Sequence, residues 1–399
     1  MEFDTERAID WLMRLLAVEG VTGKEQAIGE EIVTILKEIG VAEKDIVFDK
    51  SNKSIPVPTE TGNLIVKLKG SKRGPRRLFM THMDTVPPCA GAVPVRKGNR
   101  IIADSPTALG ADNRTGCAVL VNIIANLIEQ KLSHPPLTFL FTVREESGLF
   151  GARYVDLKKL GDPAMGFNVD GSLAQEFAIG AVGADRWQVE ITGLASHAGV
   201  APHEGISATA VVALALAEVY NGGWFGLVKK SGKVGTSNVG PVGDANGNSL
   251  GQATNVVTDY ALIKGESRSH DAKFIGEITA AYKTAFQNAA KKVTNDKGKS
   301  ARVKFSAERD YHPFALNETD AVVLQGIAAA ESLGLSPSLR MANGGLDANW
   351  IVKHKIPTIT FGAGQNEIHT VNEYCKLKDF ELGCRLGLAL ATHPEVHGK

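Results

Sequence analysis

The chain has 399 residues, and at roughly 150 residues per domain this length predicts two or three domains. Apolar residues make up 43% and charged residues 22%, which is the composition of a globular protein. Basic (Lys, Arg) and acidic (Asp, Glu) residues number 44 each, so the basic excess typical of nucleic-acid-binding proteins is missing. No apolar stretch approaches the ~18–20 residues that span a bilayer, and the acidic N-terminus is not typical of a signal peptide. We therefore expect neither a nucleic acid nor a membrane as a partner.

Cysteine usage indicates the compartment. The chain has only four cysteines, Cys89, Cys117, Cys375 and Cys384, and no two of them form a Cys-x-x-Cys pair. So few cysteines in a long chain are typical of a reducing environment. We expect a cytoplasmic protein.

The first 180 residues alternate between helical and strand-like patterns. Helical spacing of apolar residues predicts a helix at 9–16, and Thr22-Gly-Lys-Glu25 predicts a capping box that opens a second helix at Gly23. Apolar strands are predicted at 64–68, 77–83, 137–143 and 164–169, with helices at 113–130 and 149–160. Strands that are apolar on both faces are typical of an α/β domain whose sheet lies between helices.

The pattern changes near residue 185. A strand, a helix, two strands, a helix and a last strand are predicted at 187–192, 206–220, 234–239, 259–267, 271–291 and 302–308. This order predicts a ferredoxin-like α+β unit. After Asp310 the helix–strand alternation returns. The sequence therefore predicts one discontinuous α/β domain with a mixed sheet, residues 1–184 and 310–399, interrupted by a domain at 185–309.

Several common active-site motifs are missing. Ser196 has Leu194 two positions before it, so it is not the nucleophile of a Gly-x-Ser-x-Gly turn. The Gly298-Lys-Ser300 tripeptide lacks the upstream glycine of a phosphate-binding loop. Glu367 replaces the third glycine that a dinucleotide-binding fingerprint would need after Gly362-Ala-Gly364. The sequence therefore contains no motif that supports serine hydrolase, nucleoside triphosphatase or dehydrogenase activity.

Carboxylates and histidines stand instead where strands end. His82 and Asp84 close the strand at 77–83, and residues two apart in a strand share a face. A carboxylate beside an imidazole is the usual partner of a metal-bound histidine. Glu145 and Glu146 directly follow the strand at 137–143, where two carboxylates repel each other unless a cation or proton intervenes. Taken singly, these residues also fit an exposed histidine, a turn aspartate and a solvated loop.

Three further residues fit the same arrangement. Asp112 precedes the helix at 113–130, where the ordinary role of an aspartate would be that of an N-cap. Asp170 follows the strand at 164–169, and His369 follows the strand at 356–361. Ligands bind at the carboxyl ends of strands in open α/β sheets. Two histidines with several carboxylates and no thiolate suit a divalent cation such as Zn²⁺, Co²⁺ or Mn²⁺, with zinc the default expectation.

At these residues the sequence resembles the dinuclear-zinc metallopeptidase family that includes peptidase T, aminoacylase and acetylornithine deacetylase. The resemblance covers nearly the whole chain, and the segments Thr81-His-Met-Asp-Thr-Val-Pro87, Ala195-Ser-His-Ala-Gly-Val-Ala-Pro202 and Gly344-Gly-Leu-Asp-Ala-Asn349 are most similar to the peptidase T-like branch. The resemblance implies that His82 and Asp170 hold one metal, Glu146 and His369 the other, and that Asp112 bridges them. It also implies that Asp84 orients His82 and that Glu145 is the general base. The family often has a second Asp where this chain has Asn113.

The resemblance also assigns roles outside the metal site. It implies that His197 reaches toward the substrate carbonyl, often from a partner subunit, and that Arg268 clamps a substrate carboxylate. Asn255 and Gly345 match positions that line the substrate cleft. The inserted domain is then a lid that forms a homodimer. Without the resemblance, His197 would be a structural loop histidine and Arg268 a surface arginine.

The expected function is hydrolysis of an amide bond in short peptides, as in a tripeptide aminopeptidase. The metal pair would acidify a bridging water and polarise the scissile carbonyl, while Glu145 takes the proton and delivers it to the leaving amine. One alternative is a deacylase of N-acyl amino acids that uses the same two-metal site. Another is a metal- or peptide-binding module without catalysis, although its ligand set and Glu145 would then not be expected to stay complete.

Overall fold

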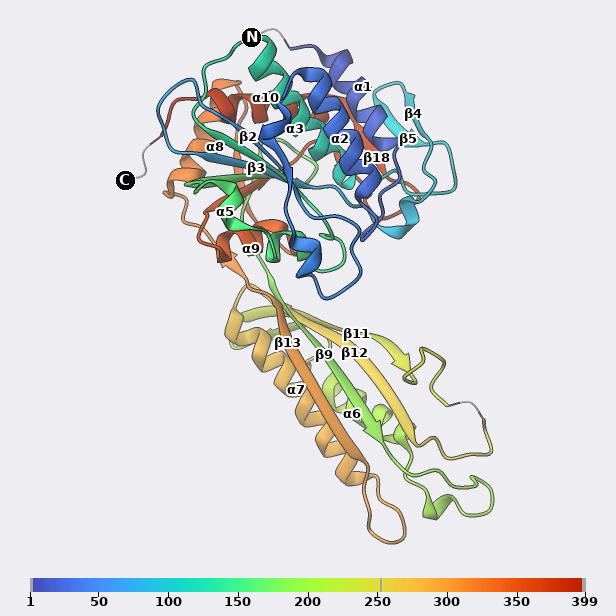
Figure 1. Ribbon diagram of the computed structural model, residues 1–399. Coiled ribbons are helices and arrows are strands. Elements are labelled where there is room, and N and C mark those ends of the chain that lie inside the picture. The colour runs from blue at the N-terminus through green and yellow to red at the C-terminus, as the bar shows by residue number, and fades with distance from the viewer. Residues whose placement is uncertain (1–2, 252, 397–399) are drawn as a thin grey trace. The chain divides into compact units, whose positions relative to one another are not determined.

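The computed structural model describes residues 3–251 and 253–396, which form two compact units (Figure 1). Unit 1 consists of Met1–Ala181 and Ala315–Lys399, and unit 2 of Val182–Phe314. Across the residues that the structure describes, no helix has the length and apolarity needed to cross a membrane.

Unit 1 is built on a nine-stranded mixed sheet. Along the main path the order is β1-β2-β6-β3-β7-β16-β8-β14, and β15 pairs with β8. The strands are β1 (Ile46–Phe48), β2 (Leu64–Leu68), β3 (Arg77–His82), β6 (Leu137–Thr142), β7 (Met165–Val169), β8 (Glu176–Ala181), β14 (Phe314–Ala315), β15 (Ser338–Ala342) and β16 (Thr358–Phe361). β3 pairs in parallel with β6 and β7, and β7 in parallel with β16. The carboxyl ends of these four strands therefore share one edge of the sheet.

Helices cover both faces of this sheet. One face packs against α1 (Thr5–Leu16), α2 (Gln26–Ile39), α3 (Ala111–Glu129), α8 (Ala321–Ser332) and α10 (Leu377–Thr392). The other face packs against α4 (Phe150–Arg153), α5 (Leu157–Leu160) and α9 (Asp347–Lys353). Successive strand residues point to opposite faces, so Phe79 joins the first core and Leu78 and Met80 join the second. The central strands β3, β6 and β7 are consequently buried along their whole length.

A smaller antiparallel sheet completes unit 1. Its order is β17-β18-β5-β4, from β17 (Gln365–Asn366), β18 (Tyr374–Lys376), β5 (Arg100–Ala103) and β4 (Pro94–Lys97). Short 3-10 helices in this unit are η1 (Glu43–Asp45), η2 (Ser51–Lys53) and η3 (Pro87–Cys89). The segment that joins β17 to β18 carries His369.

Unit 2 is a ferredoxin-like α+β unit with one added strand. Its elements are β9 (Gly183–Thr192), η4 (Pro202–Glu204), α6 (Ala208–Asn221), β10 (Gly226–Lys230), β11 (Lys233–Gly243), β12 (Tyr260–Ser269), α7 (Ala272–Lys292) and β13 (Arg302–Tyr311). The sheet order is β10-β11-β12-β9-β13, so β10 is the addition at one edge. Its core packs Trp187 of β9 against Tyr282 and Phe286 of α7.

The α/β fold with an inserted α+β unit, predicted from the sequence, is confirmed. The predicted capping box is wrong, because α2 begins at Gln26 and no side-chain hydrogen bond caps it. Glu25 is buried, and its carboxylate accepts the N–H groups of Gly23 and Arg144 instead. The helix predicted at 149–160 is divided into α4 and α5. The sequence pattern also missed β8 and β10, whose residues lack a clear alternation of apolar and polar side chains.

Candidate active site

Five side chains predicted as metal ligands lie at the carboxyl edge of the main sheet in unit 1. They are His82 at the end of β3, Asp112 in the first turn of α3, Glu146 after β6, Asp170 directly after β7, and His369 between β17 and β18. The parallel pairing of β3, β6 and β7 carries three of these segments to one place.

Asp112 connects the two histidines. Its Oδ1 lies 3.1 Å from Nε2 of His82, and its Oδ2 lies 3.3 Å from Nε2 of His369. Nε2 of His369 also lies 3.0 Å from Oε1 of Glu146. One carboxylate that faces two imidazoles from its two oxygens is the geometry needed of a ligand shared between two cations.

Two groups of potential ligand atoms overlap at His82. One group consists of His82, Asp112 and Glu146, and the other of His82, Glu145 and Asp170. Within each group the ligand atoms lie within 4.8 Å of one another. Imidazole nitrogens and carboxylate oxygens are ligands that Zn²⁺ accepts in tetrahedral or five-coordinate sites. The donor set and its spacing therefore fit divalent cations.

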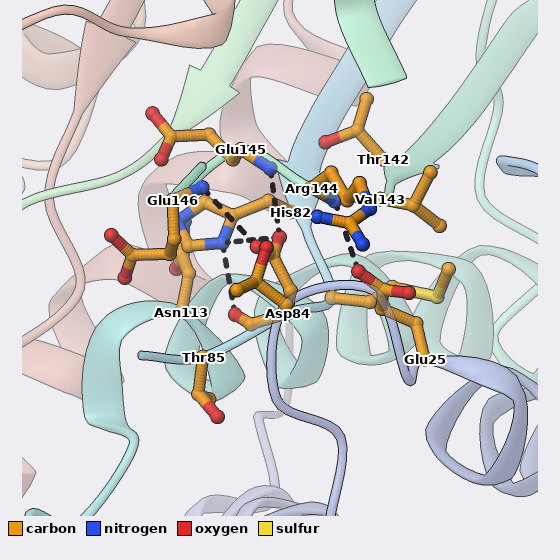
Figure 2. Close-up of polar contacts among 12 residues, drawn as sticks. Glu25, His82, Asp84, Thr85, Asn113, Thr142, Val143, Arg144, Glu145 and Glu146 are labelled. Carbon is orange, nitrogen blue, oxygen red and sulfur yellow. Dashed lines mark hydrogen bonds and ion pairs between the residues drawn. The ribbon is translucent and has the colours of Figure 1, made fainter. Parts of the chain in front are cut away.

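Asp84 organises the loops around these ligands (Figure 2). It is fully buried, and its Oδ1 lies 3.3 Å from Nδ1 of His82. The same carboxylate accepts the main-chain N–H groups of Glu145 at 3.0 Å and Glu146 at 3.2 Å. Figure 2 shows these contacts converging on Asp84 from two different segments. The main-chain carbonyl of Asp84 also lies 3.0 Å from Nδ1 of His82. Asp84 therefore contacts the histidine ring and also fixes the backbone of both glutamates.

The pKa values of the two histidines are raised, and the pKa of the aspartate between them is lowered. Burial opposes protonation of His82, but the carboxylates of Glu145, Asp112 and Asp84 raise its pKa well above the usual value. Hydrogen bonds that the ring of His369 donates to the carboxylates of Asp112 and Glu146 raise its pKa to about 10. Burial works against ionisation of Asp112, but its hydrogen bonds with His369 and His82 hold its pKa below the usual value.

The other acids have raised pKa values. Burial raises the pKa of Glu145 well above its usual value, and the nearby carboxylates of Asp170 and Glu146 act in the same direction. Burial, together with the negative charge of Asp112, raises the pKa of Asp170 to about 8. Burial also raises the pKa of Glu146. So many acids in one buried place carry an electrostatic cost that bound cations would relieve.

Asn113 has a defined structural role. Its Nδ2 donates to the carbonyl of Val169 at 2.7 Å, and its Oδ1 accepts the N–H of Gly116 at 3.0 Å and Nε2 of Gln365 at 2.8 Å. The peptide bond between Asp112 and Asn113 is cis. An aspartate here would place a carboxylate oxygen against the Val169 carbonyl, so the asparagine suits its surroundings.

Three buried acids near the site were not identified from the sequence. The sequence pattern places Glu25 in a capping box, Asp347 is the first residue of α9, and Glu373 lies in a loop segment that looks solvated in a sequence. Asp347 accepts a hydrogen bond from Thr142, and its Oδ1 has no partner within the part of the chain that the structure describes. Only the position of Glu373, four residues after His369, could have drawn attention to it.

The remaining predicted residues lie partly in unit 2. His197 and Asn255 occupy adjacent exposed segments, where the N–H of Ala198 donates to the carbonyl of Asn255. Nδ1 of His197 accepts the N–H groups of Gly199 and Val200 at 3.2 and 3.1 Å. Gly345 lies in unit 1, in the loop before α9.

Arg268 on β12 is held by an acid of its own strand. Its Nε lies 2.9 Å from Oε1 of Glu266, and its Nη2 donates to Oε2 of the same residue at 3.0 Å. Two nitrogen atoms of the guanidinium group, Nε and Nη2, thus contact Glu266 within unit 2.

Comparison with known proteins places this fold and site in a class. The model of peptidase family M20/M25/M40 matches residues 78–393, and the chain belongs to this family. The family relationship inferred from the sequence motifs is therefore confirmed.

Particular relatives cover almost the full length. YqjE of Bacillus subtilis is 30% identical over 376 residues, which is 94% of each chain. The structure of a tripeptidase from Staphylococcus aureus is 28% identical with a TM-score of 0.87, and it covers 98% of both chains. The aminopeptidase PepT from Bacillus cereus is 31% identical with a TM-score of 0.82 and the same coverage.

Proposed function

We propose that this protein is a metal-dependent aminopeptidase that removes residues from short peptides such as tripeptides. The observation that carries the proposal is the convergence of His82 and four carboxylates at one edge of the sheet, with ligand atoms within 4.8 Å of one another in two overlapping groups. A second histidine, His369, lies 3.3 Å from Asp112 and 3.0 Å from Glu146. The similarity to a tripeptidase and to an aminopeptidase over 98% of the chain supports peptides as the substrate class.

The proposed metal ligands are His82 and Asp170 for one cation and Glu146 and His369 for the other, with Asp112 shared. Zinc suits this set of nitrogen and oxygen donors, and Co²⁺ or Mn²⁺ are alternatives that the same donors accept. When bound, the cations would acidify a water molecule and polarise the scissile carbonyl.

Glu145 is the proposed general base. Its main-chain N–H is held by Asp84, while no hydrogen bond or ion pair engages its carboxylate within residues 3–251 and 253–396. A carboxylate free of such partners can accept the proton of a water and deliver it to the leaving amine. Its neighbour Glu146 is paired with His369 instead, which explains how two adjacent glutamates take different roles.

Unit 2 is proposed to act as a lid that recognises the substrate. Because Nδ1 of His197 accepts two main-chain N–H groups, the proton of the neutral ring lies on Nε2, which can donate to a substrate carbonyl oxygen. Arg268, positioned by Glu266, can bind a substrate carboxylate through its remaining N–H groups. Asn255 and Gly345 are proposed to line the cleft.

We further propose a cytoplasmic homodimer formed through unit 2. The edge strand β10 carries the exposed side chain of Leu227, and an edge strand presents unpaired backbone groups that a second copy can use. The four cysteines are all buried and unbonded, which fits a reducing compartment.

A substrate panel tests the proposed activity. The zinc-loaded protein should release N-terminal residues from tripeptides faster than it cleaves N-acetyl amino acids, as followed by mass spectrometry. Preference for the acetylated amino acids would make the protein a deacylase with the same metal site. Cleavage of neither, with metal bound, would contradict the proposed function.

A further inference from the structure

Glu373 is a buried acid that the proposed mechanism does not use. Its side chain is 2% exposed, and it lies directly before β18, in the segment that also carries His369. Throughout residues 3–251 and 253–396, no Lys, Arg or His forms an ion pair with it. A carboxylate buried without a cation needs several N–H donors to be stable.

These donors come from the loop that presents Asp112. Oε2 of Glu373 accepts the N–H of Gly110 at 2.8 Å, and Oε1 accepts the N–H of Asp112 at 2.9 Å. The thiol of Cys89 adds a weak contact at 3.9 Å. The hydrogen bond to Asp112 joins residues 261 positions apart, so it arises only from the tertiary fold.

The irregular start of α3 explains why an acceptor is needed here. Gly110 has a φ of +83°, which suits glycine, and the backbone angles of Asp112 (φ −85°, ψ 100°) and Asn113 (φ −127°, ψ 45°) are not helical. The N–H groups of Gly110 and Asp112 therefore precede the regular part of the helix, and a buried N–H group needs an acceptor. Gly110 has no side chain to provide one, and Glu373 supplies it from a distant segment.

The same segment holds Asp112 at its other end. While Glu373 binds the main-chain N–H of Asp112, His369 lies 3.3 Å from Oδ2 of that aspartate. Nε2 of Gln365 approaches Oδ1 at 3.5 Å. The backbone and the carboxylate of Asp112 are therefore both restrained by residues 365–373.

We propose that Glu373 is a positioning residue of the metal site, whose carboxylate fixes the Gly110–Asp112 backbone so that the Asp112 carboxylate faces both histidines before metal binds. The inference rests on the metal ligands assigned under the proposed function. It adds to them a residue that touches neither the metal nor the substrate.

The test compares Glu373→Gln with the wild type after removal of metal by a chelator. Gln keeps the size of the side chain but replaces one acceptor oxygen with an NH₂ group, which faces a main-chain N–H donor. Zinc affinity, measured by calorimetric titration with ZnCl₂, should fall by about 10- to 100-fold, as is typical when a residue that supports metal ligands is lost. Amide hydrogen exchange should accelerate at Gly110 and Asp112 in the metal-free protein.

Matched controls separate positioning from a general loss of stability. Glu381→Gln removes a carboxylate on α10 that pairs with Arg385 at 2.7 Å, and this variant should keep the zinc affinity of the wild type. If Glu373→Gln does not fold, Glu373→Asp retains the charge but shortens the reach, and it should show the same loss of zinc affinity.

The outcomes distinguish the two proposals. Faster exchange at Gly110 and Asp112 with zinc affinity within twofold of the wild type would make Glu373 a helix cap only and overturn the inference. Absence of zinc binding in the wild type itself would overturn the proposed metal site and this inference with it. Weaker zinc binding with unchanged exchange in β6 and α10 supports the role of Glu373.

Discussion

The two units hold their polar side chains in different ways. In unit 1 most residues of the site are buried or half-buried, with Asp84 0% and His82 2% exposed, and they are joined to each other and to main-chain N–H groups of distant segments. His369 is exposed, but its ring contacts the carboxylates of Asp112 and Glu146. In unit 2 His197 is exposed, and the hydrogen bonds to its ring within the described residues come from N–H groups two and three residues away. Bond cleavage requires fixed geometry, whereas recognition of different substrates tolerates adaptable groups. The comparison thus separates a preorganised cluster in unit 1, the proposed reaction centre, from an exposed and adaptable surface in unit 2, the proposed recognition surface.

The largest expected effect tests the reaction centre. Glu145→Gln should lower kcat by about 10²- to 10⁴-fold, because the amide cannot accept the proton of the water. Metal content, measured by elemental analysis, should stay at the wild-type value, since Glu145 is not an assigned ligand.

Glu129→Gln is the control for Glu145→Gln, because Glu129 lies on the surface of unit 1 and pairs with Arg7 at 2.6 Å. This variant should retain full activity. Wild-type activity in Glu145→Gln would remove the general base from the proposed mechanism.

The second effect tests whether unit 2 takes part in the chemistry. His197→Ala should lower kcat by about 10²-fold with unchanged metal content, because a donor to the developing oxyanion is lost. His203→Ala, another exposed histidine of unit 2, should behave as the wild type.

Mixing His197→Ala chains with Glu145→Gln chains extends this experiment. Activity should return in the heterodimer if His197 serves the site of the neighbouring subunit. No recovery after confirmed subunit exchange would mean that His197 acts within its own chain or has no catalytic role.

A smaller effect tests recognition alone. Arg268→Lys should raise KM for peptides by about tenfold and leave kcat close to the wild type, because Lys cannot form a planar bidentate contact with a carboxylate. Arg302→Lys on β13 is the matched exposed control. A fall in kcat with unchanged KM would place Arg268 in the reaction centre and weaken the division between the units.

The smallest effect concerns stability. Burial raises the pKa of Asp347 to about 7, while an unfolded aspartate titrates near 3.9. The folded state therefore retains this proton to higher pH than the unfolded chain, so Asp347 lowers the free energy of unfolding as pH rises from about 4 to 7. Asp347→Asn should remove this decline and stabilise the metal-free protein at pH 8 by about 1–3 kcal/mol.

Urea unfolding at pH 5 and pH 8 measures this change. The exposed Asp10→Asn serves as the control and should leave the difference between the two pH values unaltered. An equal stability change at both pH values would show that Asp347 does not titrate between them.

The main elements of the fold could be predicted from the sequence because their signals are local. The strands predicted at 77–83 and 137–143 agree with β3 and β6 to within one residue at each end. The capping box failed because Glu25 is drawn to the N–H of Arg144, 119 residues away, a contact that no local pattern reveals. β8 was missed because its Ala- and Gly-containing segment lacks the alternation of a half-buried strand.

The sequence by itself determined the family, the alternation of helices and strands, and the five residues that meet at the end of the sheet. It did so because residues at strand ends are recognisable from neighbouring positions and parallel strands end at one edge. Only the tertiary structure decided how these residues are held, through Asp84 on the amides of Glu145 and Glu146 and through Glu373 on the amide of Asp112. A buried carboxylate and a main-chain N–H carry no sequence signal of their pairing, because any residue can supply the N–H and only folding brings the two together.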